Sequence, residues 1–283
     1  MTASQPTQGN STSTVLGRRL GGELTRLRTT AGLTQTQAAK TLSASTGKIA
    51  KMEGGWVPIR DPDIRALCDL YNVDDPAVVG GLLELARIDR ERRKAKGWWN
   101  DAPFSPPMKE YAILESAARA IKTWQVAFIP GLLQTSGYVR ALNPDDHFVQ
   151  ARLARQRRLV DDPPLQLNAL VYEAVLRNLV GGTQVMREQL EHLASVSQQS
   201  NVSVRVLPFS AGAQLGMGCG FSLISFAEPG AMDLVYMQVP RHPLWLEGGE
   251  GVADHDELFE GIAQQALSES DSRAFISSLS KGL

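Results

Sequence analysis

Apolar residues recur at helical spacing through the first third of the chain. Leu16, Leu20, Leu24 and Leu27 are separated by three or four positions, which predicts a first helix over residues 15–30. The same periodicity predicts four further helices, over residues 34–42, 45–53, 61–71 and 75–86. We therefore expect an all-α domain of five helices at about residues 15–86.

The second and third of these helices are short and begin with clear local signals. Thr34 is a candidate N-cap, and Gln37 three residues later completes a capping box. Ser43 and Ala44 form a turn, and Ser45 is the N-cap of the next helix. Two short helices joined by a tight turn are typical of a helix-turn-helix that binds DNA.

The remainder of the chain mixes helical and strand patterns. We expect helices over residues 111–124, 148–160, 183–199, 256–267 and 271–279, and strands over residues 165–172, 202–207, 221–226 and 234–239. This order predicts an α/β domain with a small mixed sheet.

Charge is distributed unevenly along the 283 residues, although the net charge is only −1. Residues 1–60 contain eight basic side chains and two acidic ones, whereas residues 97–283 contain 14 basic and 20 acidic ones. A basic N-terminal segment followed by an acidic C-terminal one is typical of a DNA-binding domain joined to a second domain with another role. The acidic side chains concentrate at residues 247–260, where we expect either a solvated surface or a docking face for a basic partner.

The polar and apolar segments divide the chain into four parts. Residues 1–14 are polar and predict a disordered tail rather than a signal peptide, and residues 15–86 are the predicted helix-turn-helix domain. Residues 87–107 predict a solvated connector helix and a linker, and residues 108–283 a regulatory domain. No apolar run is long enough to span a bilayer, so we expect a cytoplasmic protein that does not enter membranes.

The helix-turn-helix resembles that of the Cro/C1-type (XRE) repressors. The family's run from the Leu-Thr-Gln start of one helix to the Glu-x-Gly end of the next is matched by Leu33-Thr34-Gln35, Ala38-Ala39, Ser45, Ile49-Ala50-Lys51-Met52-Glu53 and Gly55. Two positions depart from that pattern: Ser43 replaces the turn glycine, and Gly47 lies inside the second helix.

The resemblance implies a set of DNA contacts. Gln35 is expected to contact phosphate, Thr46, Gly47 and Lys48 to face base edges, and Lys51 to contact the DNA backbone. Ser45 lies on the same polar side of the helix, away from Ile49 and Met52. Lysine can donate to guanine, and threonine can contact the methyl group of thymine.

The second half of the chain resembles the uncharacterised C-terminal domain of actinobacterial WhiJ-like regulators. The residues that carry this resemblance are Ile129-Pro130-Gly131-Leu132-Leu133-Gln134-Thr135, Arg155-Gln156, Glu173, Leu176, Val180-Gly181-Gly182, Met186, Gln189-Leu190, Val206-Leu207-Pro208-Phe209, Gly212 and Phe221. The resemblance implies transcriptional control, often through a small partner protein.

No catalytic constellation stands out in the sequence. Residues 216–220 contain three alternating glycines before a predicted strand rather than between a strand and a helix, so a loop is expected instead of a nucleotide site. The four histidines are scattered, no metal-binding cluster is evident, and no cofactor is expected. Arg155 and Glu173 are a candidate buried ion pair, for which we expect a structural role.

The sequence predicts a dimeric regulator that binds double-stranded DNA and is not an enzyme. One such head contacts too little DNA for specific binding, so a homodimer on paired half-sites is expected. A small partner protein on the C-terminal domain is the favoured means of control. Two alternatives remain open: a repressor that senses a small molecule, and an enzyme coupled to a DNA-binding head.

Overall fold

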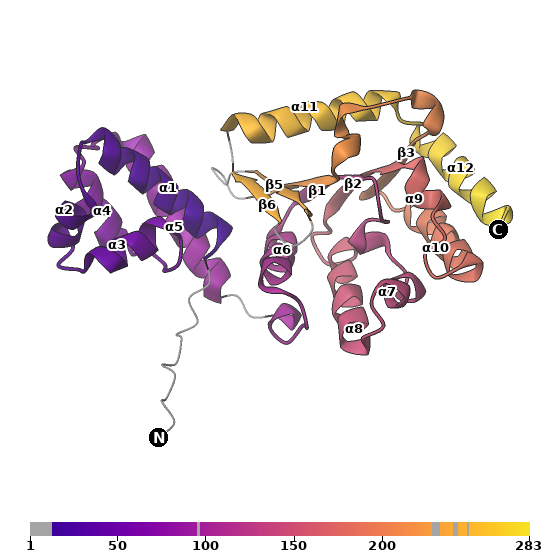
Figure 1. Ribbon diagram of the computed structural model, residues 1–283, viewed down its shortest axis with the longest axis horizontal. Helices are drawn as coiled ribbons and strands as arrows, with labels where there is room; N and C mark the ends of the chain where they lie inside the picture. The colour runs from indigo at the N-terminus through magenta and orange to yellow at the C-terminus, as the bar shows by residue number, and fades with distance from the viewer. Residues whose placement is uncertain (1–12, 95–96, 228–232, 240–242, 248) are drawn as a thin grey trace, which may run out of the picture. The chain divides into compact units, whose positions relative to one another are not determined.

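The computed structural model describes residues 13–94, 97–227, 233–239, 243–247 and 249–283. The chain divides into two compact units, residues 1–95 and residues 96–283, and Figure 1 shows the elements of each. Most of the predicted disordered tail, residues 1–12, lies outside the described residues.

The described part of the first unit is entirely helical, as predicted. Its helices are α1 (Val15–Thr30), α2 (Gln35–Thr41), α3 (Thr46–Glu53), α4 (Asp61–Leu70) and α5 (Pro76–Lys94). Their shared core is built from the apolar faces that the periodicity indicates, with Leu20, Leu24, Ile49 and Ile64 at most 1% exposed. The N-cap of α4 is Arg60, and no side chain forms a capping hydrogen bond there.

Helix α5 continues well beyond the predicted domain boundary at residue 86. Asp89 is only 2% exposed, and its carboxylate accepts hydrogen bonds from Thr14 Oγ1 at 2.5 Å and from Arg93 Nε at 2.7 Å. Arg93 also donates to the carbonyl of Gly55 at 2.6 Å. These hydrogen bonds link the C-terminal part of α5 to the start of α1 and to the turn after α3. This part of α5 therefore packs within the first unit, whereas the sequence predicted a solvated connector.

The second unit is an α/β domain, as predicted. Its helices are α6 (Pro106–Ala117), α7 (Ser136–Leu142), α8 (Asp146–Arg155), α9 (Glu173–Arg177), α10 (Thr183–Val196), α11 (Gly249–Gln265) and α12 (Glu269–Lys281). Short 3-10 turns lie at Trp98–Asn100, Gly131–Leu133, Gln156–Leu159, Phe209–Ala211 and Leu215–Gly218. No helix in the described ranges is long and apolar enough to cross a bilayer.

The strands of this unit form one mixed sheet in the order β3-β2-β1-β4-β5-β6. They are β1 (Ala120–Gln125), β2 (Gln166–Tyr172), β3 (Val202–Leu207), β4 (Phe221–Ser225), β5 (Leu234–Met237) and β6 (Leu244–Glu247). β1, β2 and β3 are parallel, whereas β4, β5 and β6 join through antiparallel pairs. Strand β6 was not predicted from the sequence.

The helix predicted over residues 111–124 is partly wrong. Helix α6 ends at Ala117, Ala118 is extended, and residues 120–125 form the central strand β1. This strand pairs with β2 on one edge and with β4 on the other. Pairing on both edges satisfies the backbone N–H and C=O groups of β1. Periodicity alone does not distinguish a short helix from a strand in so short an apolar segment.

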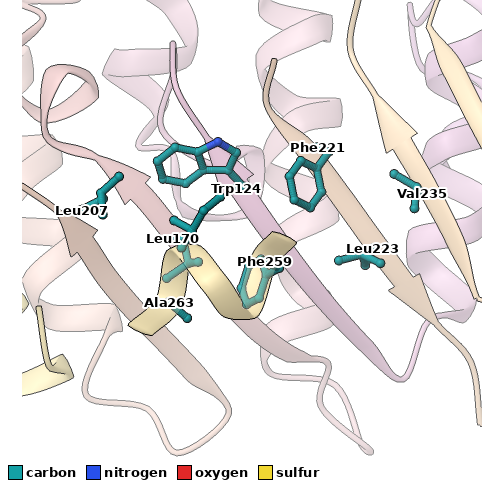
Figure 2. Close-up of a cluster of buried hydrophobic side chains, with 9 residues drawn as sticks. Trp124, Leu170, Leu207, Phe221, Leu223, Val235, Phe259 and Ala263 are labelled. Carbon is teal, nitrogen blue, oxygen red and sulfur yellow. The ribbon is translucent and has the colours of Figure 1, made fainter. Parts of the chain in front are cut away.

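One face of the sheet carries an apolar cluster that α11 covers. Trp124 is fully buried there among Leu170, Phe221 and Leu223 from neighbouring strands, and Phe259 and Ala263 reach it from α11 (Figure 2). Figure 1 shows α6, α7 and α8 on the opposite side of the sheet. Because side chains alternate along β1, Thr123 faces that opposite side beside Ser222 of β4.

Candidate nucleic-acid interface

The helix-turn-helix is positioned by the caps that the sequence predicts. Thr34 Oγ1 accepts from the backbone N–H of Gln37 at 3.3 Å, and the Gln37 side chain accepts from the N–H of Thr34 at 2.8 Å. Ser45 Oγ accepts from the N–H of Lys48 at 3.2 Å and so starts α3. Both capping predictions are confirmed.

The turn between α2 and α3 contains a strained backbone position. Ser43 has φ of 47°, a left-handed conformation that a side chain disfavours. Its N–H donates to Lys40 and the N–H of Ala44 donates to Ala39, so α2 ends in a Schellman motif. The family glycine that Ser43 replaces would adopt this conformation without strain.

Replacing Ser43 by glycine is expected to stabilise the first unit by about 1 kcal/mol, because the left-handed penalty disappears. Chemical denaturation of the full chain followed by circular dichroism measures this change. Ala44→Gly is the matched control, because Ala44 does not have positive φ and glycine there only adds freedom to the unfolded chain. Equal effects of the two substitutions would contradict the strain at Ser43.

Helix α3 presents an exposed polar face. Ile49 and Met52 are each 1% exposed and anchor the helix, while Ser45, Thr46, Gly47, Lys48 and Lys51 are exposed. Within the described residues, neither lysine takes part in an ion pair, and a Cβ added to Gly47 would meet only Ser45 Oγ, at 3.9 Å. The predicted base-facing positions therefore share one accessible surface.

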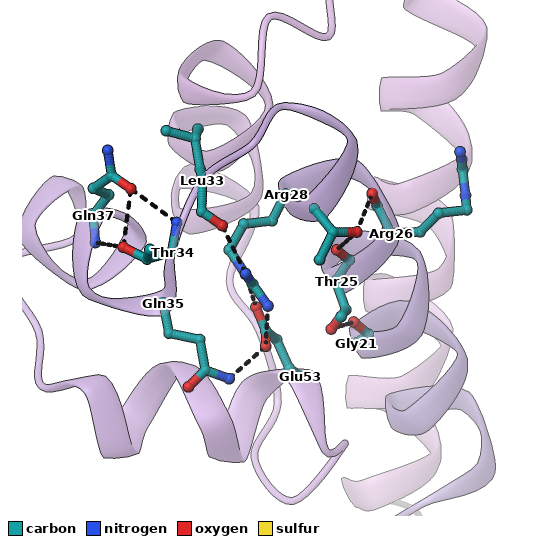
Figure 3. Close-up of polar contacts among 10 residues, drawn as sticks. Gly21, Thr25, Arg26, Arg28, Leu33, Thr34, Gln35, Gln37 and Glu53 are labelled. Carbon is teal, nitrogen blue, oxygen red and sulfur yellow. Dashed lines mark hydrogen bonds and ion pairs between the residues drawn. The ribbon is translucent and has the colours of Figure 1, made fainter.

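Gln35 is placed differently from these residues. Its Nε2 donates to Glu53 Oε2 at 2.7 Å, and Arg28 donates to both oxygens of the same carboxylate at 2.6 and 3.1 Å (Figure 3). Arg28 also donates to the carbonyl of Leu33 at 2.8 Å. The amide of Gln35 thus helps to tie α2 to α3, and its expected phosphate contact stays a prediction.

The Arg28–Glu53 pair is a feature that sequence reasoning missed. Both side chains are about 10% exposed, so Arg28 does not belong to the basic surface suggested by charge counting. Hydrogen bonding to Glu53 raises the pKa of Arg28. Glu53 of the Glu-x-Gly run could have indicated this pair, because a buried carboxylate needs a cation as its partner.

The backbones of α1 and α3 approach each other closely, which was not predicted from the sequence. A Cβ on Gly21 would lie 2.6 Å from the carbonyl oxygen of Met52 and nearer still to the carbonyl of Glu53. Gly55, with φ of 70°, lies directly against the backbone of Gly17 and Arg18. The spacing of Gly17 and Gly21, one helical turn apart, was the available signal.

The candidate ion pair between Arg155 and Glu173 is not formed. Arg155 instead pairs with Glu115 at 2.7 Å, and Glu173 pairs with Arg177 at 2.6 Å. Glu173 also accepts from the N–H of Phe209 at 2.8 Å, which fixes the segment after β3. Across the residues that the structure describes, no group of three histidine, cysteine or acidic side chains is arranged to hold a metal ion.

Comparison with known families agrees with both halves of this description. HTH_31, a helix-turn-helix domain, matches residues 19–79, and DUF5753, a domain of unknown function, matches residues 108–278. The chain belongs to the DUF5753 family. These matches confirm the resemblance to an XRE-type regulator with an uncharacterised C-terminal domain, and the helix-turn-helix supports a DNA-binding regulator. A search of curated proteins and a search of solved structures each found no match.

The boundaries of the matches locate the candidate interface. The helix-turn-helix match contains α2, α3 and every predicted DNA-contacting residue. The DUF5753 match begins in α6, includes every strand of the sheet and ends within α12. The two matches do not overlap, and the DUF5753 match spans 171 residues.

Proposed function

We propose that this DUF5753 protein is a dimeric cytoplasmic transcriptional regulator that inserts α3 into the major groove of DNA. The exposed face of α3 carries the proposal. Thr46 and Lys48 lie on the first turn of that helix, where side chains of a helix-turn-helix contact base edges, and Lys51 lies one turn further along. Gln35 and Ser45 stand at the starts of α2 and α3, from which they contact phosphates.

Two copies of the chain are proposed to bind one operator. A single head of this kind contacts only a few base pairs, and paired half-sites about 34 Å apart supply the remaining specificity. We therefore expect a pseudo-palindromic operator. Selection of duplexes from a random pool by the full chain, followed by sequencing, tests this directly, and enrichment of single unpaired half-sites would contradict the dimer.

Lys48→Ala is expected to weaken binding to a selected duplex by about 5- to 150-fold, because one base contact contributes about 1–3 kcal/mol. Lys51→Ala is expected to lower affinity for all sequences and to reduce the salt slope of log K by about one, because it removes one phosphate contact. A gel shift titrated with salt measures both effects.

Lys281→Ala is the matched control for both variants. Lys281 is also an exposed lysine, but it ends α12 in the second unit of the chain. This variant should bind DNA as the unmodified protein does. Unchanged binding by both Lys48→Ala and Lys51→Ala would refute the assignment of α3 as the recognition helix.

The DUF5753 domain is proposed to control DNA binding through a small partner protein. Helix α11 buries Phe259 and Ile262 against the sheet, while Glu250, Asp254 and Glu257 on the same helix are exposed. Lys122 of β1 pairs with Asp256 at 2.6 Å and with Glu260 at 2.8 Å, whereas Glu250, Asp254 and Glu257 have no ion pair among the described residues. An exposed acidic helix face favours a partner with a basic surface.

Native mass spectrometry of the protein isolated gently from its own host tests the means of control. A stoichiometric small polypeptide on the dimer supports partner control, and its loss on Asp254→Lys/Glu257→Lys substitution would place it on α11. A bound mass of a few hundred daltons would instead support the second candidate, a regulator that senses a small molecule. That candidate is favoured by a polar cavity within the DUF5753 domain, between α6, α8 and the sheet.

A further inference from the structure

Two arginines of α8 meet above a glycine in the interior of the DUF5753 domain. Arg152 and Arg155 are three residues apart and lie on the same side of the helix. A Cβ on Gly131 would lie 2.6 Å from Nη1 of Arg152 and 3.3 Å from Nη1 and Nη2 of Arg155. The missing side chain of Gly131 thus makes the space in which the two guanidinium groups converge.

Only one of these two charges is balanced. Arg155, at 3% exposure, donates from Nε and Nη2 to the two oxygens of Glu115, each at 2.7 Å, and Glu115 is itself buried. No carboxylate among the described residues pairs with Arg152, whose guanidinium stacks on the ring of Phe148 at 5.4 Å. Burial and the charge of Arg155 lower the pKa of Arg152 to about 10, so both arginines are charged at neutral pH.

Both guanidinium groups hold N–H groups that have no partner. Arg152 Nε and Arg155 Nη1 are buried and donate no hydrogen bond to the described part of the chain. Leaving buried charged donors unpaired is costly, and such groups in native proteins usually meet a ligand, an ion or water. The structure therefore contains donors for an acceptor that the chain itself does not supply.

A small polar cavity is lined by Arg155 and by Gly131, the glycine over which the Arg152 guanidinium also lies. It has a volume of about 30 Å³, and its walls include Tyr111, Thr123, Gln125, Gly131, Arg155 and Ser222. A volume of this size holds about two or three water-sized groups. Thr123 Oγ1 lies 2.9 Å from both Ser222 Oγ and Gln125 Nε2, so the sheet side of the cavity is a hydrogen-bonded polar wall.

We propose that this cavity binds a small carboxylate, with Arg152 and Arg155 as its ligands. A carboxylate has two acceptor oxygens in one plane, which suits two guanidinium groups that each retain a free donor. Its negative charge balances the one excess positive charge between α6 and α8. Monocarboxylates of the size of formate or acetate match the volume. This inference concerns ligand binding by the DUF5753 domain and does not depend on the proposed DNA contacts.

Sodium acetate and sodium formate are the probes for this site. The melting temperature of the full chain should rise saturably when either salt replaces sodium chloride at constant ionic strength. Isothermal titration then gives the affinity, and Arg152→Gln should weaken acetate binding at least tenfold. Arg157→Gln is the matched control, because Arg157 is an exposed arginine just beyond α8 and should leave the affinity unchanged.

Stability in chloride provides a second, independent measurement. Arg152→Gln removes a buried charge that has no protein partner, so the variant should be at least as stable as the unmodified chain when no carboxylate is present. Substituting an arginine with a purely structural role would lower stability instead, and that result would overturn the proposal. Equal responses to acetate and chloride, or a stronger response to phosphate than to acetate, would also overturn it. Neither measurement uses DNA, so failure here is distinguishable from failure of α3 to bind an operator.

Discussion

Gly21→Ala should destabilise the helix-turn-helix domain by about 3 kcal/mol, a large share of the 5–15 kcal/mol that stabilises an ordinary domain. The added methyl group would lie 2.6 Å from the carbonyl oxygen of Met52. The contacting atoms are backbone atoms of α3, which cannot rotate away as a side chain would. Helix α3 would have to move away from α1, and the recognition surface would move with it.

The adjacent residue provides a matched control. Gly22 lies on the same helix, is exposed, and has nothing within 4 Å of an added Cβ. Gly22→Ala should therefore stabilise the domain by up to about 1 kcal/mol through helix propensity alone. Denaturant unfolding of both variants and a gel shift with the same duplex measure stability and DNA binding. Stability of Gly21→Ala equal to that of Gly22→Ala would contradict the close approach of α1 and α3.

Glu53→Ala should destabilise the same domain by about 3–5 kcal/mol, because it leaves the Arg28 guanidinium buried without its carboxylate. Arg28 and Glu53 form a bidentate pair in which both side chains are about 10% exposed. The substitution also removes the acceptor of Gln35 Nε2. Contacts among α1, α2 and α3 are lost together, so we expect DNA binding to fall with stability.

Two further variants separate the pair from a general effect of charge. Glu23→Ala removes a carboxylate that pairs with Arg19 and Arg26 at 3.0 Å on the surface of α1, and it should cost less than about 1 kcal/mol. Arg28→Met/Glu53→Leu removes both buried charges and should be less destabilising than Glu53→Ala alone. A double variant that is as unstable as the sum of the single ones would show that the two groups do not interact.

Local signals were sufficient to predict the helix-turn-helix. A capping box at Thr34 and Gln37 and a cap at Ser45 involve residues at most three positions apart, so the sequence contains both partners of each bond. The periodicity of α1 is equally local, because every turn of a helix repeats the same face. The exposed face of α3 follows from these two features, and so do the candidate DNA-contacting residues.

The positions that sequence reasoning missed depend on residues far apart in the chain. Ile121 and Trp124 belong to a strand because β2 and β4, about 45 and 100 positions further on, pair with it. Arg155 has Glu115 rather than Glu173 as its partner, because α6 packs beside α8. Periodicity indicates that such residues are buried, but it carries no information on which distant group faces them.

The sequence by itself determined the kind of domain at each end, the caps of α2 and α3, and the surface that α3 presents, since these depend on propensities and contacts within a few residues. Only the tertiary structure decided that Arg28 is buried against Glu53 and that the backbone of α3 lies directly against Gly21. It also decided that Arg152 and Arg155 converge over Gly131. The physical reason is the same in each case. The environment of a buried charge or a missing side chain is set by backbone segments that come together only when the chain folds.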